Sequence, residues 1–288
     1  MTIAITLVYD RIRWEEKAIS KAVENQGLSI RRIDAKELVL DSSKGDQEVE
    51  RELGSLVLQR CVSYFRGLHV ASFLEAKGIK VINSSEVSRI CGNKFLTTLY
   101  LEKGGSPTPK TLFTFSGEAA KNAADLLGYP SVLKPIVGSW GRGVARLNDK
   151  ESASALIEMR EDTNGLFNQI YYIQKHIPRP PRDIRTVVIG DELISANYRY
   201  SPQGEWRTNF SKGGRIEYCE ITSELQDIVL KASGAVGGGI LGVDAMEGPE
   251  GLVVHEVNSN VEFRGASQVS NVDIAVKIVD YLVQEAKR

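Results

Sequence analysis

A glycine-rich segment and a nearby strand lysine are the first residues in the sequence that could do chemistry. Residues 138–143 read Gly-Ser-Trp-Gly-Arg-Gly and lie between two apolar stretches, so we expect a loop joining two strands of a hairpin. Backbone N–H groups of such a loop can surround phosphate oxygens, although the Gly-Lys-Ser/Thr ending of a Walker loop is missing. Taken alone, the loop is better explained by turn geometry. Lys134 favours a phosphate site, because an ammonium in an apolar strand is costly to bury without an anion.

Oxygen-bearing side chains form a second candidate site. Asp244 lies near the end of one expected strand, and Glu256 and Asn258 end its hairpin partner. Strand alternation puts Glu256, Asn258 and Asn260 on one face, with Asp244 able to lie across from them. Each acidic residue alone is more simply explained as a solvated hairpin end. Two carboxylates and an amide together suit Mg²⁺.

Other metal chemistry is disfavoured by the rest of the sequence. The three cysteines and three histidines are scattered, without the paired spacing of zinc or redox sites; they are Cys61, Cys91, Cys219, His69, His176 and His255. We therefore expect reduced thiols and a metal bound only by oxygen.

The elements that must position these residues fall into two regions. Up to about residue 83, strands alternate with helices, which predicts a small parallel sheet of βαβ type. The expected strands are 2–9, 28–33, 56–60 and 80–82, and the expected helices are 14–25 and 68–77. Residues 10–13 read Asp-Arg-Ile-Arg where a dinucleotide fold would have its glycine-rich turn, so a nicotinamide cofactor is disfavoured.

Beyond residue 84 the pattern is dominated by hairpins with flanking helices, which is typical of an α+β region. The expected hairpins are 131–146, 185–199 and 241–257; the expected helices are 85–102, one beginning after Ser116, 223–236 and 273–287, with a strand at 110–115. The fold class is thus an α/β N-terminal domain with a small parallel sheet, followed by an α+β region.

Composition excludes several classes of protein. The 288 residues carry 36 basic and 37 acidic side chains, a net charge of −1, and no basic stripe with interleaved aromatic residues. Binding to nucleic acid is therefore not expected. No apolar run approaches the roughly 20 residues that cross a bilayer, and the opening residues predict a strand rather than a signal peptide. We expect a cytoplasmic protein with no membrane segment.

The order of these motifs resembles that of an ATP-grasp ligase over essentially the whole chain. The matching segments are Lys94, Lys134-Pro135, the 138–143 loop, Gln174-Lys175-His176-Ile177, Asp183-Ile184-Arg185, Arg199, Gly242-Val243-Asp244 and Glu256-Val257-Asn258-Ser259-Asn260. Within that superfamily the chain looks most like the RimK branch, and particularly like the carrier-protein ligases of lysine and arginine biosynthesis called LysX and ArgX. That closer resemblance rests on Asn83-Ser84-Ser85, the 138–142 segment, Arg182-Asp183-Ile184-Arg185, Arg207-Thr208-Asn209, Gly213-Gly214, Glu256-Val257-Asn258 and Glu262-Phe263.

The resemblance implies three domains and an amide-forming reaction. Residues 1–84 would be the pre-ATP-grasp domain, 85–173 the central subdomain with the phosphate loop, and 174–288 the C-terminal subdomain with the magnesium and substrate sites. ATP would phosphorylate a carboxylate, and an amine would attack the acyl phosphate. In the carrier branch the carboxylate is the γ-carboxyl of the C-terminal glutamate of an acidic amino-group carrier protein, and the amine belongs to α-aminoadipate or glutamate.

The resemblance also implies roles for individual residues. The ATP-binding set is Lys94, Lys134, Gly138, Ser139, Trp140, Gly141, Arg142, Gln174, Lys175, Ile177 and Asp183. Two Mg²⁺ ions would lie on Asp244, Glu256 and Asn258; Arg185 and Arg199 would stabilise the acyl phosphate; and Asn209, Asn260 and Arg264 would bind the substrates. Without the resemblance, the arginines could equally be solvated strand residues. Lys175 departs from the family pattern, which often has glutamate there; an adenine contact made by the main chain is compatible with that change.

Several readings of the function remain open at this point. Segments 207–214 and 258–263 look more like the α-aminoadipate type, while glutamate, or both amino acids, is the alternative. Two further alternatives are a RimK-like ligase that acts on another protein tail and a nucleotide-binding regulator without catalysis. The family leads us to expect a homo-oligomer, a dimer or tetramer. Candidates for a basic rim that meets the acidic carrier are Arg179, Arg182, Lys212, Arg215 and Arg264.

Overall fold

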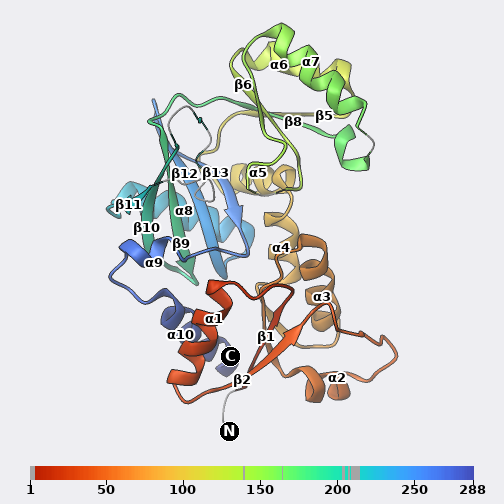
Figure 1. Ribbon diagram of the computed structural model, residues 1–288, viewed down its shortest axis with the longest axis vertical. Coiled ribbons are helices and arrows are strands. Elements are labelled where there is room, and N and C mark those ends of the chain that lie inside the picture. Colours follow the sequence, from red (N-terminus) through yellow and green to blue (C-terminus); the bar gives the residue numbers. More distant parts are fainter. Residues whose placement is uncertain (1–3, 139, 164, 203–204, 207, 209–214) are drawn as a thin grey trace.

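The computed structural model describes residues 4–288, apart from residues 139, 164, 203–204, 207 and 209–214. Three sheets and their covering helices make up this part of the chain (Figure 1). The expected fold class, a parallel N-terminal sheet followed by a region of antiparallel sheets, is confirmed. Among the described helices, none combines the length and the apolar character needed to cross a bilayer.

The N-terminal sheet has the strand order β2-β1-β3-β4, and all its strand pairs are parallel. Its elements are β1 (Ala4–Tyr9), α1 (Trp14–Asn25), β2 (Ser29–Asp34), α2 (Asp46–Leu53), β3 (Leu56–Gln59), α3 (Tyr64–Ala76) and β4 (Lys80–Ile82). The βαβ expectation is therefore confirmed. The short, mostly charged helix α2 was not anticipated, because its only buried residues are Val49 and Leu53.

The single helix expected over 85–102 is wrong, because the chain forms two helices there, α4 (Ser85–Cys91) and α5 (Lys94–Lys103). The Asn93 side-chain oxygen accepts hydrogen bonds from the N–H groups of Phe95 and Leu96, at 3.0 and 3.3 Å, and so starts a new helix. Gly92 lies against the Tyr64 ring, 2.0 Å from where a Cβ would be. The break makes Lys94 the first residue of α5.

The central sheet is antiparallel, with the order β5-β8-β6-β7. Its elements are β5 (Thr111–Thr114), α6 (Gly117–Leu127), β6 (Ser131–Lys134), β7 (Ala145–Leu147), α7 (Lys150–Glu161), a 3₁₀ turn (Leu166–Gln169) and β8 (Tyr171–Lys175). The hairpin expected over 131–146 is present as β6 and β7. Residues 174 and 175 belong to β8, so we propose that the central subdomain ends after Lys175 rather than at 173.

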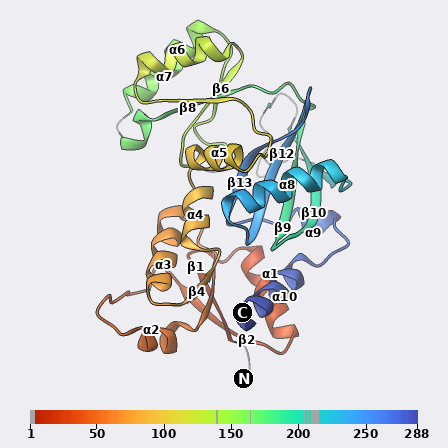
Figure 2. The same cartoon turned by 180° about the vertical axis from the view of Figure 1, so that it is seen from behind.

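The C-terminal sheet has the order β11-β10-β9-β12-β13. Its elements are β9 (Arg182–Ile189), β10 (Glu192–Tyr200), β11 (Ile216–Tyr218), α8 (Ser223–Val236), β12 (Ile240–Gly248), β13 (Gly251–Asn258), α9 (Ala266–Val269) and α10 (Ile274–Lys287). Helix α8 covers one face, where Ile184, Val188 and Val243 are buried (Figure 2). The other face is therefore left for polar residues at one end, and for Val187 and Ile189 at the other.

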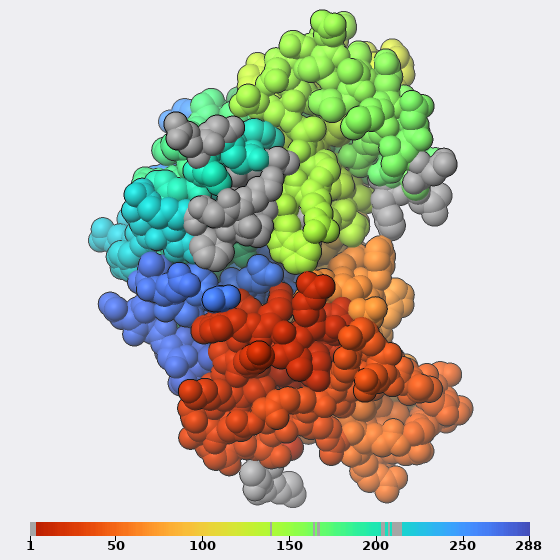
Figure 3. All heavy atoms as spheres, viewed as in Figure 1, coloured from red at the N-terminus to blue at the C-terminus, as the bar shows by residue number. Residues whose placement is uncertain are grey.

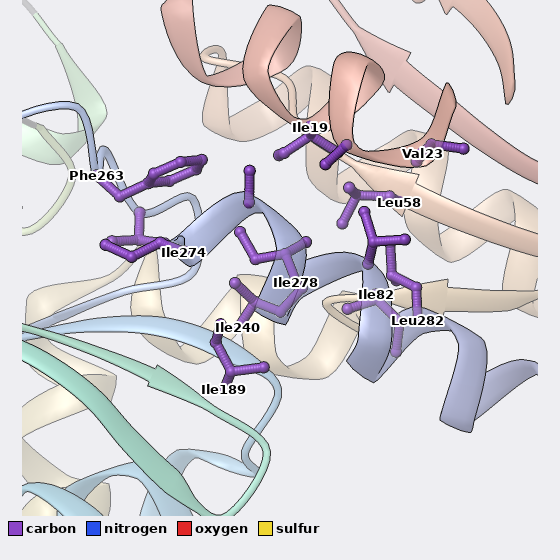
Figure 4. Packing of buried hydrophobic residues seen from close by; sticks show 14 of the residues in the cluster. Ile19, Val23, Leu58, Ile82, Ile189, Ile240, Phe263, Ile274, Ile278 and Leu282 are labelled. Atoms are coloured by element: carbon purple, nitrogen blue, oxygen red, sulfur yellow. The ribbon is translucent and has the colours of Figure 1, made fainter. Parts of the chain in front are cut away.

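The last helix, α10, packs against α1 near the start of the chain. Ile278 and Leu282 of α10 pack with Ile19 and Val23 of α1, in a core that also includes Leu58 of β3 (Figure 4). This core joins the N-terminal sheet to the C-terminal sheet, since Ile189 and Ile240 belong to it as well. The two ends of the chain thus form one packed unit below the polar face (Figure 1).

A buried ion-pair cluster reinforces this contact. Arg60 Nε donates to Glu16 Oε1 at 3.0 Å, and Arg60 Nη1 donates to the Val261 carbonyl at 3.0 Å. Arg13 Nη2 donates to Glu16 Oε1 at 2.8 Å. Burial would raise the pKa of Glu16, but Arg13 and Arg60 outweigh it and hold the pKa below its usual value. The N-terminal domain therefore holds the loop after β13 by charge as well as by packing.

Removing the charge of Glu16 should destabilise the protein strongly. The Glu16→Gln variant leaves Arg60 buried without its counter-charge, which costs about 3 kcal/mol in comparable cases. We expect a clear drop in the urea midpoint, followed by tryptophan fluorescence. The control is Glu24→Gln, whose pair with Arg32 is 43–54% exposed and should matter by less than about 1 kcal/mol. Equal effects of the two changes would show that the cluster does not stabilise the interface.

Candidate active site

The register of the C-terminal sheet gathers charged side chains on the face opposite α8. Arg185 of β9 pairs with Asp244 of β12, which in turn pairs with Glu256 of β13. Two residues before Arg185 on the same strand, Asp183 pairs with Arg199 of β10. Because alternate residues of a strand share a face, Asp183 and Arg185 point the same way. The expected catalytic and metal-binding residues are thus brought together.

Two arginines and two aspartates form a buried charge network in this row. Arg199 donates to both carboxylate oxygens of Asp183, at 2.8 Å each, and its Nη2 lies 3.2 Å from Asp244 Oδ2. Arg185 Nη2 donates to the same Asp244 oxygen at 3.0 Å. Burial alone would lower the pKa of Arg199, but Asp183 and Asp244 raise it above its ordinary value. Both guanidinium groups are therefore fixed in orientation.

Asp183, which is expected to contact ATP, has two protein partners in this structure. Its two oxygens accept the Arg199 guanidinium, and the Thr208 hydroxyl donates to one of them. The side chain is only 2% exposed. Asp183 is placed to orient Arg199.

Glu256 and Lys94 form a second charged pair next to this row. Lys94 Nζ donates to Glu256 Oε1 at 3.0 Å and to the Gly138 carbonyl at 2.9 Å. Burial would raise the pKa of Glu256, but Lys94, His255 and Lys134 lower it to about 2. Glu256 is thus ionised at neutral pH, and Lys94 links it to the glycine-rich loop.

His255 is a site residue that the sequence did not reveal. The register shifts from Asp244 opposite Glu256 to Ala245 opposite Val254, so His255 is the extra residue of a β-bulge. Its Nε2 is buried without a hydrogen-bond partner, and burial, with Lys134 nearby, lowers its pKa to about 3. A neutral imidazole therefore borders the charged groups. No sequence signal marks a bulge here, because it is a property of two paired strands.

Lys134 ends strand β6 of the central sheet and lies near enough to Glu256 and Asp244 to interact with their charges. Its Nζ donates to Gln174 Oε1 at 2.6 Å and lies 5.8 Å from the centre of the Tyr172 ring. Burial, together with Lys94 and Arg179, outweighs the acidic groups and lowers the pKa of Lys134 to about 8. Such a lysine gains from an incoming anion.

Strand β8 and the residues after it are expected to bind adenine, and one of the side chains, that of Gln174, already has hydrogen-bond partners within the protein. Gln174 Nε2 donates to Thr111 Oγ1 at 3.0 Å and to the Tyr172 hydroxyl at 2.8 Å. Lys175 is exposed and ends β8, with its N–H donating to the Lys110 carbonyl. Ile177 follows the strand and lies against Gly248. Main-chain recognition of adenine by the residues that follow β8 is compatible with the lysine at 175.

The glycine-rich loop is described except for Ser139, which lies outside the described residues. Trp140 has a positive φ of 59°, and Gly141 and Gly143 share this left-handed conformation, at 66° and 69°. Such backbone is natural for glycine and strained for tryptophan. The Arg142 guanidinium lies 5.3 Å from the centre of the Trp140 ring. The loop therefore has a defined, tightly turned tip.

Asp244, Glu256 and Asn258 fit a magnesium site by the chemistry of their donors. Asp244 Oδ1 is buried without a hydrogen bond, although Arg185 Nε lies 2.5 Å from it in ion-pair contact. The described residues contain no cluster of three or more His, Cys, Asp or Glu side chains that could hold a metal. The three residues offer two carboxylates and one amide. That set leaves the remaining positions of an octahedral ion to water and phosphate oxygens, as Mg²⁺ prefers.

The three expected substrate-binding residues behave differently. Asn209 lies outside the described residues. Asn260 uses both ends of its amide: Nδ2 donates to the Cys61 carbonyl at 2.7 Å, and Oδ1 accepts from Arg13 at 3.1 Å. Arg264 has an exposed side chain, and its backbone N–H donates to Glu15 at 3.1 Å. Asn260 is thus placed to hold its loop against the N-terminal domain.

The chain matches known families along nearly its whole length. Residues 91–282 match the RimK-like ATP-grasp domain, and residues 5–90 match the LysX preATP-grasp domain. Two proteins of Sulfurisphaera tokodaii are similar: the α-aminoadipate–LysW ligase LysX, 36% identical over 97% of this chain and 96% of that protein, and the glutamate–LysW ligase ArgX, 35% identical over 96% and 97%.

Solved structures agree with this assignment. A RimK domain ATP-grasp protein from Sphaerobacter thermophilus superposes with a TM-score of 0.79 at 25% identity, covering 97% of this chain and 99% of that one. The ATP-grasp ligase PsnB, in complex with a minimal precursor, Mg and ADP, shares the fold with a TM-score of 0.74 at 21% identity, covering 99% of each chain. With the charged row, the lysines and the loop in place, the chain belongs to the RimK-like ATP-grasp family and is an ADP-forming carboxylate–amine ligase.

Proposed function

We propose that the protein joins α-aminoadipate to the γ-carboxyl of the C-terminal glutamate of a LysW-like carrier protein, using ATP. The observation that carries the ligase part is the fixed Arg185–Asp244–Arg199 network beside Glu256, Lys94 and the glycine-rich loop. The carrier part is supported by similarity to LysX and ArgX over nearly the full chain. The two relatives are almost equally similar, so the choice of α-aminoadipate rests on segments 207–214 and 258–263.

The first step needs positive charge around the nucleotide phosphates. Lys134 of β6 and Lys94 of α5 both lie near Glu256, and Lys94 also holds the carbonyl of Gly138 in the glycine-rich loop. In this proposal Asp244, Glu256 and Asn258 would hold two Mg²⁺ ions, and these ions would supply positive charge against the negative charge of the phosphates. Lys94 would then exchange part of its contact with Glu256 for a phosphate oxygen.

The second step needs donors aimed at the acyl phosphate. Arg185 and Arg199 supply planar guanidinium groups whose orientation is already fixed by Asp183 and Asp244. Donors fixed before the reaction need no reorganisation when charge develops, and this is how such groups accelerate acyl transfer. The amine of the amino acid then displaces phosphate and forms the amide.

A second candidate for the amine is glutamate. Besides ArgX, the tetrahydromethanopterin:α-L-glutamate ligase of Methanocaldococcus jannaschii is 39% identical over 73% of this chain and 72% of that protein. Glutamate is shorter than α-aminoadipate by one methylene, and such a difference is worth roughly 1 to 3 kcal/mol in a pocket. Measurable use of both amino acids is therefore compatible with a preference for one.

The direct test is ATP-dependent ligation, followed by intact mass of the carrier. With a carrier ending in glutamate, we expect a mass gain of one α-aminoadipate residue and a roughly tenfold or larger advantage in kcat/KM over glutamate. The control is the same carrier truncated by its last residue, which should gain nothing. A preference for glutamate would move the enzyme to the ArgX type, and no gain with either amino acid would contradict a carrier substrate.

Arg199 should matter to catalysis through its geometry and not only its charge. The Arg199→Lys variant keeps a positive charge but loses the bidentate contact with Asp183, so we expect kcat to fall about 100-fold while KM for ATP changes little. Arg89→Lys on the surface of α4 is the matched control. A kcat within threefold of wild type would show that the guanidinium does not stabilise the reaction.

ATP affinity should fall at high pH because of Lys134. Its pKa near 8 in the free protein means that it is charged at pH 7 and largely neutral at pH 9. The groups that set this pKa are Glu256 and Asp244, which raise it, and Lys94 and Arg179, which lower it. We expect ATP–Mg to bind up to tenfold more weakly at pH 9 in calorimetric titrations. Lys134→Arg should remove that dependence; an unchanged slope would assign it to another group.

A further inference from the structure

A pocket of about 840 Å³ lies between the N-terminal sheet and the glycine-rich loop, and of its lining residues only Trp140 and Arg142 belong to the expected ATP-binding set. One wall consists of residues 9–12, after β1, with Asp34 and Lys36 beside them. Another wall comes from residues 62–66, after β3, and Trp140 and Arg142 close it. Figure 3 shows the lime-green loop segment directly above the red N-terminal segment. The pocket therefore has walls from two domains.

The pocket lies at the place in the N-terminal sheet where open parallel sheets commonly bind ligands. The chain passes from β1 to β2 on one side and later to β3 on the other, so the strand order reverses between β1 and β3. Ligands of such sheets bind in the crevice beyond the carboxyl ends of the strands at this point. Tyr9 ends β1, and Val62 follows β3, so the pocket occupies that crevice.

The crevice is not built for a phosphate at the start of α3. The Asp10 carboxylate already accepts the N–H groups of Val62 and Ser63, at 2.8 and 3.0 Å, and it also pairs with Arg66 at 2.6 Å. These are the donors that a phosphate would otherwise use at a helix N-terminus. The Asp-Arg-Ile-Arg turn thus replaces a phosphate loop by an internal carboxylate and leaves Arg11 exposed.

The pocket keeps an excess of positive charge. Its lining has four basic side chains and two acidic ones; Arg66 pairs with Asp10, and Lys36 with Asp34. Among the described residues, neither Arg11 nor Arg142 has a carboxylate partner. Ile12 is 51% exposed and Trp140 38%, so apolar surface lies beside these two guanidinium groups. A ligand that carries carboxylates next to small apolar groups would complement this lining in charge and polarity.

We propose that this pocket binds an acidic peptide segment of the protein that donates the carboxylate. The inference rests on the proposed function, because only a protein substrate has such a segment. A volume near 840 Å³ is typical of sites that hold drug-sized ligands, roughly 300–1,000 Å³, and exceeds the need of one amino acid. The glycine-rich loop links the two sites: Gly138 is held by Lys94 on the nucleotide side, while Trp140 and Arg142 line the peptide side.

The test uses peptide binding to the full-length protein without turnover. The probe is a fluorescein-labelled, C-terminally amidated peptide of alternating glutamate and leucine, and its glutamine counterpart is the uncharged comparison. Fluorescence anisotropy should show binding of the glutamate peptide that weakens with salt. Arg11→Glu should raise its Kd at least tenfold, and Arg11→Lys should restore most of the affinity. The matched control is Arg51→Glu on α2, at the opposite end of the sheet, which should stay within twofold.

Each outcome decides between named alternatives. Equal binding of the glutamine peptide, or no effect of Arg11→Glu, would overturn the proposal. Displacement of the probe by inorganic phosphate at lower concentration than by unlabelled peptide would also overturn it, in favour of a phosphate site. Arg11-dependent peptide binding without carrier ligation would contradict the proposed function but retain the peptide site. If Arg11→Glu ligates the carrier with the same KM as the wild-type protein, the proposed function would be retained and the peptide site contradicted.

Discussion

The register of the C-terminal sheet is the constraint on which the site depends. Its strands place Arg185, Asp244 and Glu256 side by side on one face, while Ile184 and Val243 between them point into the core under α8. A slip of one residue would bury the charges and expose the apolar residues, so packing specifies the register strongly. The alternation that builds the core therefore also builds the site, and neither can be shifted without the other.

Burial of the charges explains why they are arranged as a network. Asp183 and Asp244 are each 2% exposed, and a buried carboxylate without a partner is costly. Arg199 contacts both, and Arg185 contacts Asp244, so the donors are held before any substrate arrives. The same logic applies to Lys94 and Glu256. What stabilises the free protein is thus also what prepares it for a reaction that moves negative charge.

The sequence predicted the elements with strong periodicity and the polar residues at strand ends. Helices α1 and α8 and strand β4 have the bounds expected from apolar spacing, and Lys134, Asp244 and Glu256 do converge. The misses have physical reasons. The break at Gly92-Asn93 depends on a side-chain cap and on Tyr64 from another helix. The bulge at His255 arises from the pairing of β13 with β12, which periodicity does not contain.

The N-terminal domain is more than a support for the ligase part. Arg60 holds the carbonyl of Val261, and Asn260 holds that of Cys61, so the segment just after β13, the strand of Glu256, is fixed by the domain that begins the chain. The glycine-rich loop, in turn, lines a pocket with the residues at the end of β1. A movement of the N-terminal domain would therefore act on the glycine-rich loop and on the strand of Glu256 together. A substrate that bridges this domain and the loop would favour the arrangement in which it contacts both, because binding energy shifts an equilibrium only when the ligand contacts differ between the states.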